Sequence, residues 1–327
     1  MKKKMKVLIA YDGSECAEAA LDDLGQAGLP ETGEAIVMSI TEMWLPPPPA
    51  SSYEIVEQAM FVHVPSDLKK VYVKGSHAVK EAKALAERGA ARVRATFPKW
   101  RVRAEATYGS PAWELVFKAD AWKPDLIVMG SHGRSALGRF VLGSVSQRVL
   151  TEAHGSVRIA RGRVEEPNTP VRLIVGVDGS HASMAAVREV AERNWPAQSQ
   201  VRIVVVDDPL ETTFIGEFIP PVAETVAYSN RMDRVKVEKL AENVAKLIKS
   251  KSLHVSTAVE EGNPKHVLSA AAEKWGANCI FLGATGVSNR FERFLLGSVS
   301  AAVAARAHCS VEVVRAPAKR KRKTNGN

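Results

Sequence analysis

A glycine-rich stretch in the first half of the chain combines residue types that suit a phosphate group. Two residues separate Gly130 from Gly133, nine more follow, and then come Gly143 and Ser144. Glycines let backbone N–H groups come close to an anion. A helix is expected to begin at Gly143-Ser144, where free N–H groups, the helix dipole and the Ser144 hydroxyl would all favour phosphate. Taken alone, the same spacing is equally typical of tight turns before a helix.

An acidic turn, Asp12-Gly13-Ser14, follows the apolar run 7–10 near the start of the chain. In doubly wound sheets, ligands bind beyond the carboxyl ends of the strands. Both the acidic turn and the glycine-rich stretch follow segments that we expect to be strands. Ser14 is also a suitable N-cap for a helix over 15–24. We therefore expect the turn and the glycines to contribute to one binding site.

The chain carries this pattern twice. The run that leads to Asp12 resembles the run that leads to Asp178, and the stretch around Gly143 resembles the stretch around Gly297. The second copy has ten residues, not nine, between Gly286 and Gly297. One extra residue in such a loop can bulge harmlessly or can displace the glycines from a ligand. The second candidate site comprises Asp178, Gly179, Ser180, Gly283, Gly286, Gly297 and Ser298.

Each copy alternates short apolar runs with segments of helical period, which predicts a parallel sheet with helices on both faces. Helices are expected over 15–24, 67–95 and 144–153, and Pro111 and Pro264 suit the first turn of two more. Strands are expected at 6–10, 35–40, 101–108, 126–129 and 157–160 in the first copy and at 173–177, 202–206, 254–259, 279–282 and 311–314 in the second.

The length of 327 residues suits about two domains of roughly 150 residues. With 46% apolar and 25% charged residues, the composition is that of an ordinary globular protein. We expect one domain over 1–163, a linker over 164–170, a second domain over 171–316 and a basic disordered tail over 317–327.

The net charge of +9 comes from the two ends of the chain. Four lysines among the first six residues and five basic residues at 319–323 account for all of it. A continuous basic groove for nucleic acid is therefore not supported. No apolar run is long enough to span a membrane, and the three cysteines form no C-x-x-C pair. We expect a cytoplasmic protein without a membrane or a specific nucleic-acid partner.

Common catalytic and nucleotide motifs are absent from the sequence. It contains neither G-x-x-x-x-G-K-[ST] nor G-x-G-x-x-G, and neither H-E-x-x-H nor G-x-S-x-G. His132 lies within the glycine-rich stretch, but the sequence offers it no evident Ser or Asp partner, which disfavours a catalytic role. We predict no catalytic residue and no dedicated metal ligand.

With these motifs in place, the chain resembles a tandem member of the universal stress protein family. Nucleotide-binding members of that family carry an Asp after the first strand and the signature G-x2-G-x9-G-[ST]. Asp12 matches the acidic position, and the stretch from Gly130 to Ser144 matches the signature. The resemblance covers both copies and implies two tandem α/β domains of Rossmann-like, adenine nucleotide alpha hydrolase-like fold, each with a five-stranded parallel sheet.

The resemblance also implies an adenine-nucleotide site in each domain, with ATP as the ligand, alone or with Mg or Mn. The signature glycines and the following Ser would bind ribose and phosphates, and the Asp would lie by the nucleoside. Ile40 and Val206 would line the adenine pocket, although no motif fixes these two positions. Family domains commonly pair through their last strands, which implies intramolecular domain pairing and leaves room for a further homodimer.

Three functions remain open from the sequence. The leading hypothesis is a stress-response ATP-binding protein that acts as a nucleotide-dependent binding or regulatory module. A slow ATPase or nucleotide-using enzyme is the second, although no base, metal cluster or arginine finger is evident. A nucleotide-free scaffold is the third, and the intact glycines of the first copy argue against it.

Overall fold

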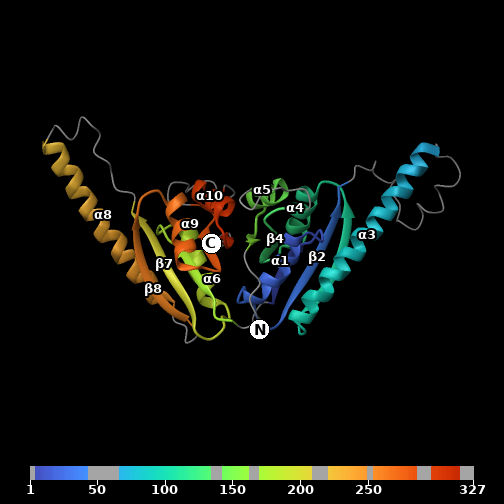
Figure 1. Ribbon diagram of the computed structural model, residues 1–327, viewed down its shortest axis with the longest axis horizontal. Coiled ribbons are helices and arrows are strands. Elements are labelled where there is room, and N and C mark those ends of the chain that lie inside the picture. The colour runs from blue at the N-terminus through green and yellow to red at the C-terminus, as the bar shows by residue number, and fades with distance from the viewer. Residues whose placement is uncertain are drawn as a thin grey trace, which may run out of the picture. The chain divides into compact units, whose positions relative to one another are not determined.

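The computed structural model describes residues 4–42, 66–133, 142–161, 169–207, 220–248, 253–285 and 296–316 (Figure 1). The chain divides into two compact units. Unit 1 comprises Met1–Thr169 and His308–Ser310, and unit 2 comprises Pro170–Ala307 and Val311–Asn327. Most of the expected linker and the whole expected tail lie outside the described residues.

Unit 1 contains a five-stranded sheet in the order β3-β2-β1-β4-β5, and all of its pairings are parallel. This confirms the predicted sheet. Its strands are β1 (Met5–Ala10), β2 (Gly33–Thr41), β3 (Arg101–Tyr108), β4 (Leu126–Gly130) and β5 (Ser156–Ala160), and its helices are α1 (Glu15–Asp23), α3 (Ser66–Thr96), α4 (Pro111–Trp122) and α5 (Ser144–Glu152).

Strand alternation gives the sheet of unit 1 two different faces. On one face, Val7 and Ile9 of β1 pack in one apolar cluster with Leu21 of α1 and Ala90 of α3. The intervening residues of β1, such as Leu8, point to the opposite face of the sheet. Because both faces are covered, the strands read as continuous apolar runs.

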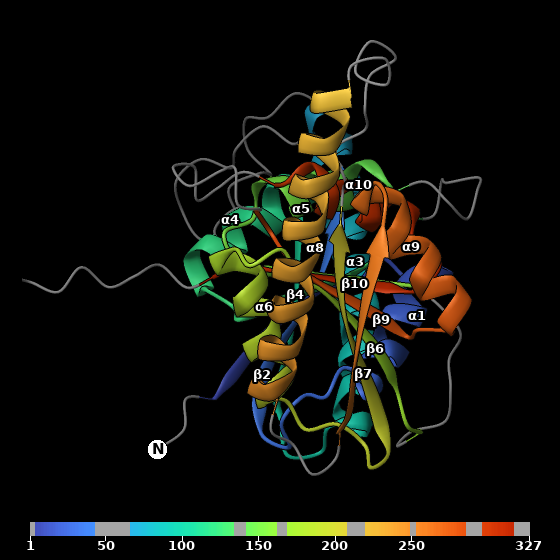
Figure 2. The ribbon, with the colours of Figure 1, turned by 90° about the vertical axis from the view of Figure 1, so that its left-hand side faces the viewer.

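Unit 2 repeats the topology in the order β10-β9-β6-β7-β8, with parallel pairing of β6 with β7, β6 with β9 and β7 with β8. The long helix α8 runs along β7 and β8 (Figure 2). Its strands are β6 (Arg172–Gly176), β7 (Ser199–Asp207), β8 (Leu253–Glu261), β9 (Cys279–Gly283) and β10 (Ser310–Val314), and its helices are α6 (His181–Glu192), α8 (Pro220–Leu247), α9 (Pro264–Trp275) and α10 (Ser298–Arg306).

Many element boundaries differ from the prediction by one to three residues, and the first helix and β6 are two examples. The first helix ends at Asp23 and continues as the 3-10 turn Leu24–Gln26. Strand β6 ends at Gly176 instead of Val177. The Val177 N–H still donates to the Val204 carbonyl at 3.0 Å, so the backbone leaves the ladder only where the acidic turn begins.

In each unit, an arginine–carboxylate pair anchors the last strand. The strand carries the arginine in unit 1 and the carboxylate in unit 2. In unit 1, Arg158 of β5 donates to Asp23 with an Nη2–Oδ1 distance of 3.0 Å. In unit 2, Glu312 of β10 accepts from Arg193 with an Nη1–Oε2 distance of 2.9 Å. Arg158 and Glu312 follow the same Ser-Val pair in the repeated sequence. The repeat therefore preserves the ion pair but not its polarity.

No helix within the described ranges is both long enough and apolar enough to cross a membrane.

Candidate functional site

The acidic turn of unit 1 follows β1 directly and starts α1. Gly13 adopts a φ of +73°, in the left-handed region that favours glycine. The Ser14 N–H donates to Asp12 Oδ1 at 3.0 Å, and the Ser14 hydroxyl accepts from the Ala17 N–H at 3.2 Å. Ser14 is thus the N-cap of α1, as predicted. These bonds hold the Asp12 carboxylate at the carboxyl end of β1.

The glycines of unit 1 bring the second motif to the same place. Gly130 ends β4 against α1, since a Cβ on it would lie 2.7 Å from the backbone carbon and oxygen of Cys16. A Cβ on Gly133 would lie 2.9 Å from Asp12 Oδ2. The two motifs are therefore neighbours in space, as expected from the carboxyl ends of adjacent parallel strands.

The third glycine of unit 1 precedes α5. The Gly143 N–H donates to the Ser131 carbonyl at 2.8 Å, and Gly143 is the N-cap of α5. Ser144 begins the helix and is exposed. The Ser146 hydroxyl donates to the Gly130 carbonyl at 2.9 Å and ties α5 to the end of β4. A helix N-terminus therefore points into the same loop region, where its N–H groups favour an anion.

His132 has a hydroxyl partner that the sequence analysis did not find. Ser131 Oγ lies 3.0 Å from His132 Nδ1, and the same oxygen lies 3.9 Å from Cys16 Sγ. The expectation that His132 lacks a Ser partner is wrong, because the partner is its own neighbour in the chain. Ser131 is buried, however, so its hydroxyl positions the imidazole rather than facing the loop opening.

Unit 2 reproduces the acidic turn. The Ser180 N–H donates to Asp178 Oδ1 at 2.9 Å, and Gly179 has a φ of +78°. The Ser180 hydroxyl accepts from the Ser183 N–H at 3.1 Å and caps α6. It also donates to the Thr285 carbonyl at 3.3 Å, which joins the acidic turn to the second glycine loop.

The glycines of unit 2 make the same close approaches. A Cβ on Gly283 would lie 2.4 Å from backbone atoms of Ala182 and Ser183. The Gly297 N–H donates to the Ala284 carbonyl at 2.6 Å, and the Ser300 hydroxyl donates to the Gly283 carbonyl at 2.6 Å. Gly286 and the longer loop after it lie outside the described residues.

A pocket of about 530 Å³ opens at the carboxyl ends of the unit 2 strands. Its volume is within the range of small-molecule sites. Gly179 and Ser180 belong to the adjoining turn rather than to the lining. Five of the predicted site residues line the pocket, namely Asp178, Val206, Gly283, Gly297 and Ser298.

The apolar wall of this pocket is not predicted by the sequence motifs. Gly176, Val204, Pro264, Leu268 and Leu282 line it beside Val206. Strand alternation could have identified Val204, which precedes Val206 by two residues on the same strand. In unit 1, Ile40 occupies the corresponding end of β2, where it pairs with Thr107 of β3. Its place beside a nucleotide base stays a prediction.

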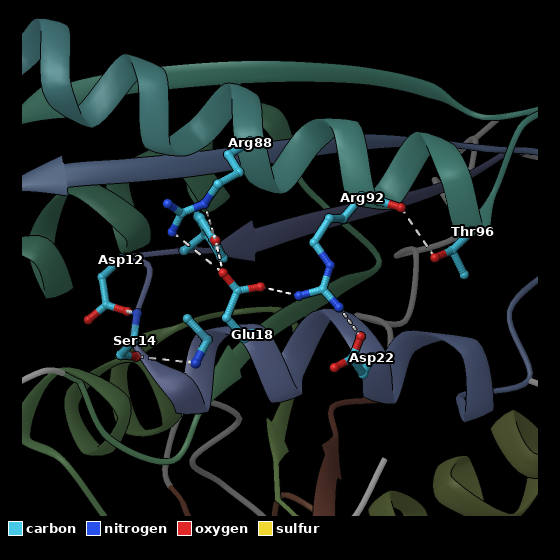
Figure 3. Close-up of polar contacts among 9 residues, drawn as sticks. Asp12, Ser14, Glu18, Asp22, Arg88, Arg92 and Thr96 are labelled. Atoms are coloured by element: carbon cyan, nitrogen blue, oxygen red, sulfur yellow. Dashed lines mark hydrogen bonds and ion pairs between the residues drawn. The ribbon is translucent and has the colours of Figure 1, made fainter. Parts of the chain in front are cut away.

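A polar network between Tyr11 and the helices α1 and α3 supports the acidic turn of unit 1 (Figure 3). The Tyr11 hydroxyl donates to Glu18 of α1 and accepts from Arg88 Nε of α3 at 3.1 Å. Arg92 of α3 donates to both Glu18 and Asp22. The network joins the residue before Asp12 to two helices and so restricts the position of the turn.

The network also shifts the pKa values of Tyr11 and Glu18. Burial raises the pKa of the Tyr11 phenol above 10.0, and the hydrogen bond to Glu18 raises it further. Burial acts to raise the pKa of the Glu18 carboxyl as well. The hydrogen bonds from Tyr11 and Arg92, together with the charges of Arg92 and Arg88, outweigh burial and hold that pKa below 4.5.

Within the described parts of the chain, no cluster of three or more His, Cys, Asp or Glu side chains is placed to hold a metal ion.

Two five-stranded sheets, each with an Asp-Gly-Ser turn and a glycine loop at the carboxyl ends of its strands, define a tandem doubly wound α/β protein. Comparison with known families gives the finer assignment. Residues 4–161 and 171–315 each match the universal stress protein family, and the chain belongs to that family.

One relative and two solved structures illustrate what the chain is similar to. Universal stress protein MJ0531 of Methanocaldococcus jannaschii is 32% identical over 163 residues, which are 48% of this chain and 81% of that protein. A solved universal stress protein from Archaeoglobus fulgidus shares the fold with a TM-score of 0.60 and 20% identity, over 95% of this chain and 98% of its own. A universal stress protein solved in complex with cAMP is 24% identical, covers 44% of this chain and 95% of its own, and has a TM-score of 0.29.

Proposed function

We propose that this protein binds adenine nucleotides, with ATP as the principal ligand, at the acidic turn and glycine loop of each unit. The observation that carries the proposal is the pocket of unit 2, because a carboxylate, two loop glycines and the serine that begins α10 line it together with an apolar wall. A carboxylate beside a helix N-terminus suits a ligand that combines hydroxyl groups with phosphates.

Each part of the pocket has a distinct role in this proposal. Val204 and Val206 offer an apolar surface to the flat base. Asp178 accepts hydrogen bonds from the ribose hydroxyls. Gly297 is the N-cap of α10 and Ser298 begins the helix, so the N–H groups of its first turn and the Ser298 hydroxyl receive the phosphates. Bound Mg or Mn would neutralise phosphate charge.

We propose that the protein acts as a nucleotide-dependent binding module in the stress response, and that it does so in the cytoplasm. Ligand that binds only the folded protein stabilises it by mass action. At a hundredfold excess over the dissociation constant, this linkage amounts to about 2.7 kcal/mol. Such a gain can shift the population of conformations and change the surface that a partner meets.

Calorimetric titration of the full chain with ATP tests the proposal. We expect saturable binding that Asp178→Ala weakens at least about tenfold in unit 2, because the ribose loses its acceptor. Asp178→Asn keeps an acceptor oxygen and should lose less. Phosphate release well above buffer that disappears in Gly143→Val would instead favour an enzyme. Absence of any binding at millimolar ATP would support a scaffold without nucleotide.

A further inference from the structure

The two units have the same polar end of the site but differ at the apolar end. At the polar end, the Ser14 N–H to Asp12 bond of 3.0 Å matches the Ser180 N–H to Asp178 bond of 2.9 Å. The glycine before α5 and the glycine before α10 also make the same type of backbone bond. Within the described residues, the acidic turn and the glycine before the last helix therefore do not distinguish the units.

The floor of the unit 2 pocket depends on the lack of a side chain at Gly176. A Cβ at this position would lie 2.5 Å from Leu282 Cδ2 and 3.2 Å from both methyl groups of Leu268. Both leucines line the pocket. Any side chain at residue 176 would therefore push leucine methyl groups from their present places and alter the space at the floor.

Unit 1 carries a larger side chain at this position and at two neighbouring ones. Ala10 pairs with Met38 in unit 1 as Gly176 pairs with Val204 in unit 2. Ile40 of unit 1 corresponds in the same way to Val206 of unit 2. At all three positions the unit 1 side chain is one heavy atom larger. Met38 is buried, so its extra atom occupies interior space.

These three positions lie on one face of the sheet. Gly176, Val204 and Val206 all line the pocket, and they alternate with Val175, Ile203 and Val205, which pack in the core cluster of the other face. The same alternation in unit 1 leaves Val7, Ile9 and Val37 in the opposite core cluster. The three larger side chains of unit 1 therefore point to the face where a base would bind.

We propose that unit 2 is the tighter nucleotide site of the protein and that Ala10, Met38 and Ile40 make unit 1 the weaker one. This inference rests on the proposed nucleotide function. A single added or missing carbon in an apolar pocket changes discrimination by about tenfold or more. Three such differences, all at the base end, separate the affinities of the two units for ATP by at least about tenfold.

Calorimetry of the full chain with ATP, combined with an exchange of the three residues, tests the inference. The wild type should show one tight and one weaker class of site. Asp178→Ala should remove the tight class, whereas Asp12→Ala should leave it. The combined change Gly176→Ala, Val204→Met and Val206→Ile should weaken the tight class at least about tenfold. Val206→Ile alone is the milder variant and should weaken it by a smaller factor.

The reverse exchange provides the matched experiment. Ala10→Gly, Met38→Val and Ile40→Val should raise the ATP affinity of unit 1 toward that of unit 2, and a gain of binding cannot come from a failure to fold. Two classes of equal affinity that respond to neither exchange would overturn this inference and leave the proposed function standing. No ATP binding in the wild type would overturn the proposed function and this inference with it.

Discussion

Gly133 lies so close to Asp12 that a Cβ on the glycine would come within 2.9 Å of the carboxylate oxygen Oδ2. The two residues belong to motifs that are far apart in the sequence and that follow β4 and β1, which pair in parallel. Any side chain at residue 133 would displace the carboxylate or compete for the space beside it. The glycine-rich stretch and the acidic turn are therefore neighbours in space.

Gly133→Ala should weaken nucleotide binding in unit 1 without unfolding it. The added methyl group would crowd Asp12 Oδ2, yet Gly133 is exposed and its neighbour is a side-chain atom. We expect at least about a tenfold loss of ATP affinity at this site, measured by calorimetry in a background that carries Asp178→Ala.

Gly25→Ala is the matched control for this change. Its Cβ would meet only Thr96 Cγ2, at 3.9 Å, which is an ordinary contact. The control should keep the ATP affinity of the parent protein. Equal affinities for Gly133→Ala and Gly25→Ala would contradict the role given to the Asp12–Gly133 contact.

Gly130→Ala should lower the stability of the fold and not only the affinity for the ligand. Its Cβ would lie 2.7 Å from the backbone of Cys16, and backbone atoms cannot move aside as a flexible side chain can. Overpacking of this kind costs about 1–3 kcal/mol. Thermal melting should show a clear decrease in the Tm of Gly130→Ala relative to Gly25→Ala. An unchanged Tm would mean that β4 and α1 are not held in contact at this glycine.

The pH dependence of stability should report the network around Glu18. The pKa of Glu18 in the folded protein lies below 4.5, its usual value, so the carboxylate contributes stability that is present above about pH 4.5 and is lost as the pH falls through the lower folded-state pKa. Glu18→Gln should therefore lower the Tm at pH 7, and the gap to the wild type should narrow toward pH 3.5. A gap that stays constant over this range would show that the charge of Glu18 does not stabilise the fold.

Removing one charge of the buried pair of Arg193 and Glu312 should lower the stability of the protein. Glu312 is 0% and Arg193 is 5% exposed at the side chain. Glu312→Gln leaves Arg193 paired with Glu189, whose side chain is 36% exposed, and should destabilise the protein by at most about 3–5 kcal/mol. The double variant Arg193→Met, Glu312→Leu should lose less, because both members of the buried pair are then apolar. Urea unfolding followed by circular dichroism gives the comparison, and a double variant that is less stable than Glu312→Gln would contradict it.

The fold was predictable because its signals are local and repeated. The apolar stripe of 67–95 gave the long helix found at Ser66–Thr96, and alternation over 101–108 gave β3 at the same residues. The repeat of the acidic turn and the glycines then fixed which strand ends lie together. Each of these signals depends on spacing within a short segment.

The polar contacts between α1 and α3 have no such local signal in the sequence. Arg88 and Arg92 meet Glu18 across some seventy residues of sequence, and exposed charges at helical spacing are ordinary on any helix surface. The apolar wall of the pocket was missed for a different reason. Leu268 and Leu282 have the periodicity of core residues, and only the tertiary structure shows that they border an open pocket.

Native mass spectrometry of the full chain with added ATP tests the central claim most directly. The wild type should bind up to two molecules of ATP, and a double variant with Asp12→Ala and Asp178→Ala should bind neither at the same concentration. ATP adducts that persist unchanged in the double variant, or a wild type that takes up no ATP, would contradict the assignment of the two acidic turns and glycine loops as nucleotide sites.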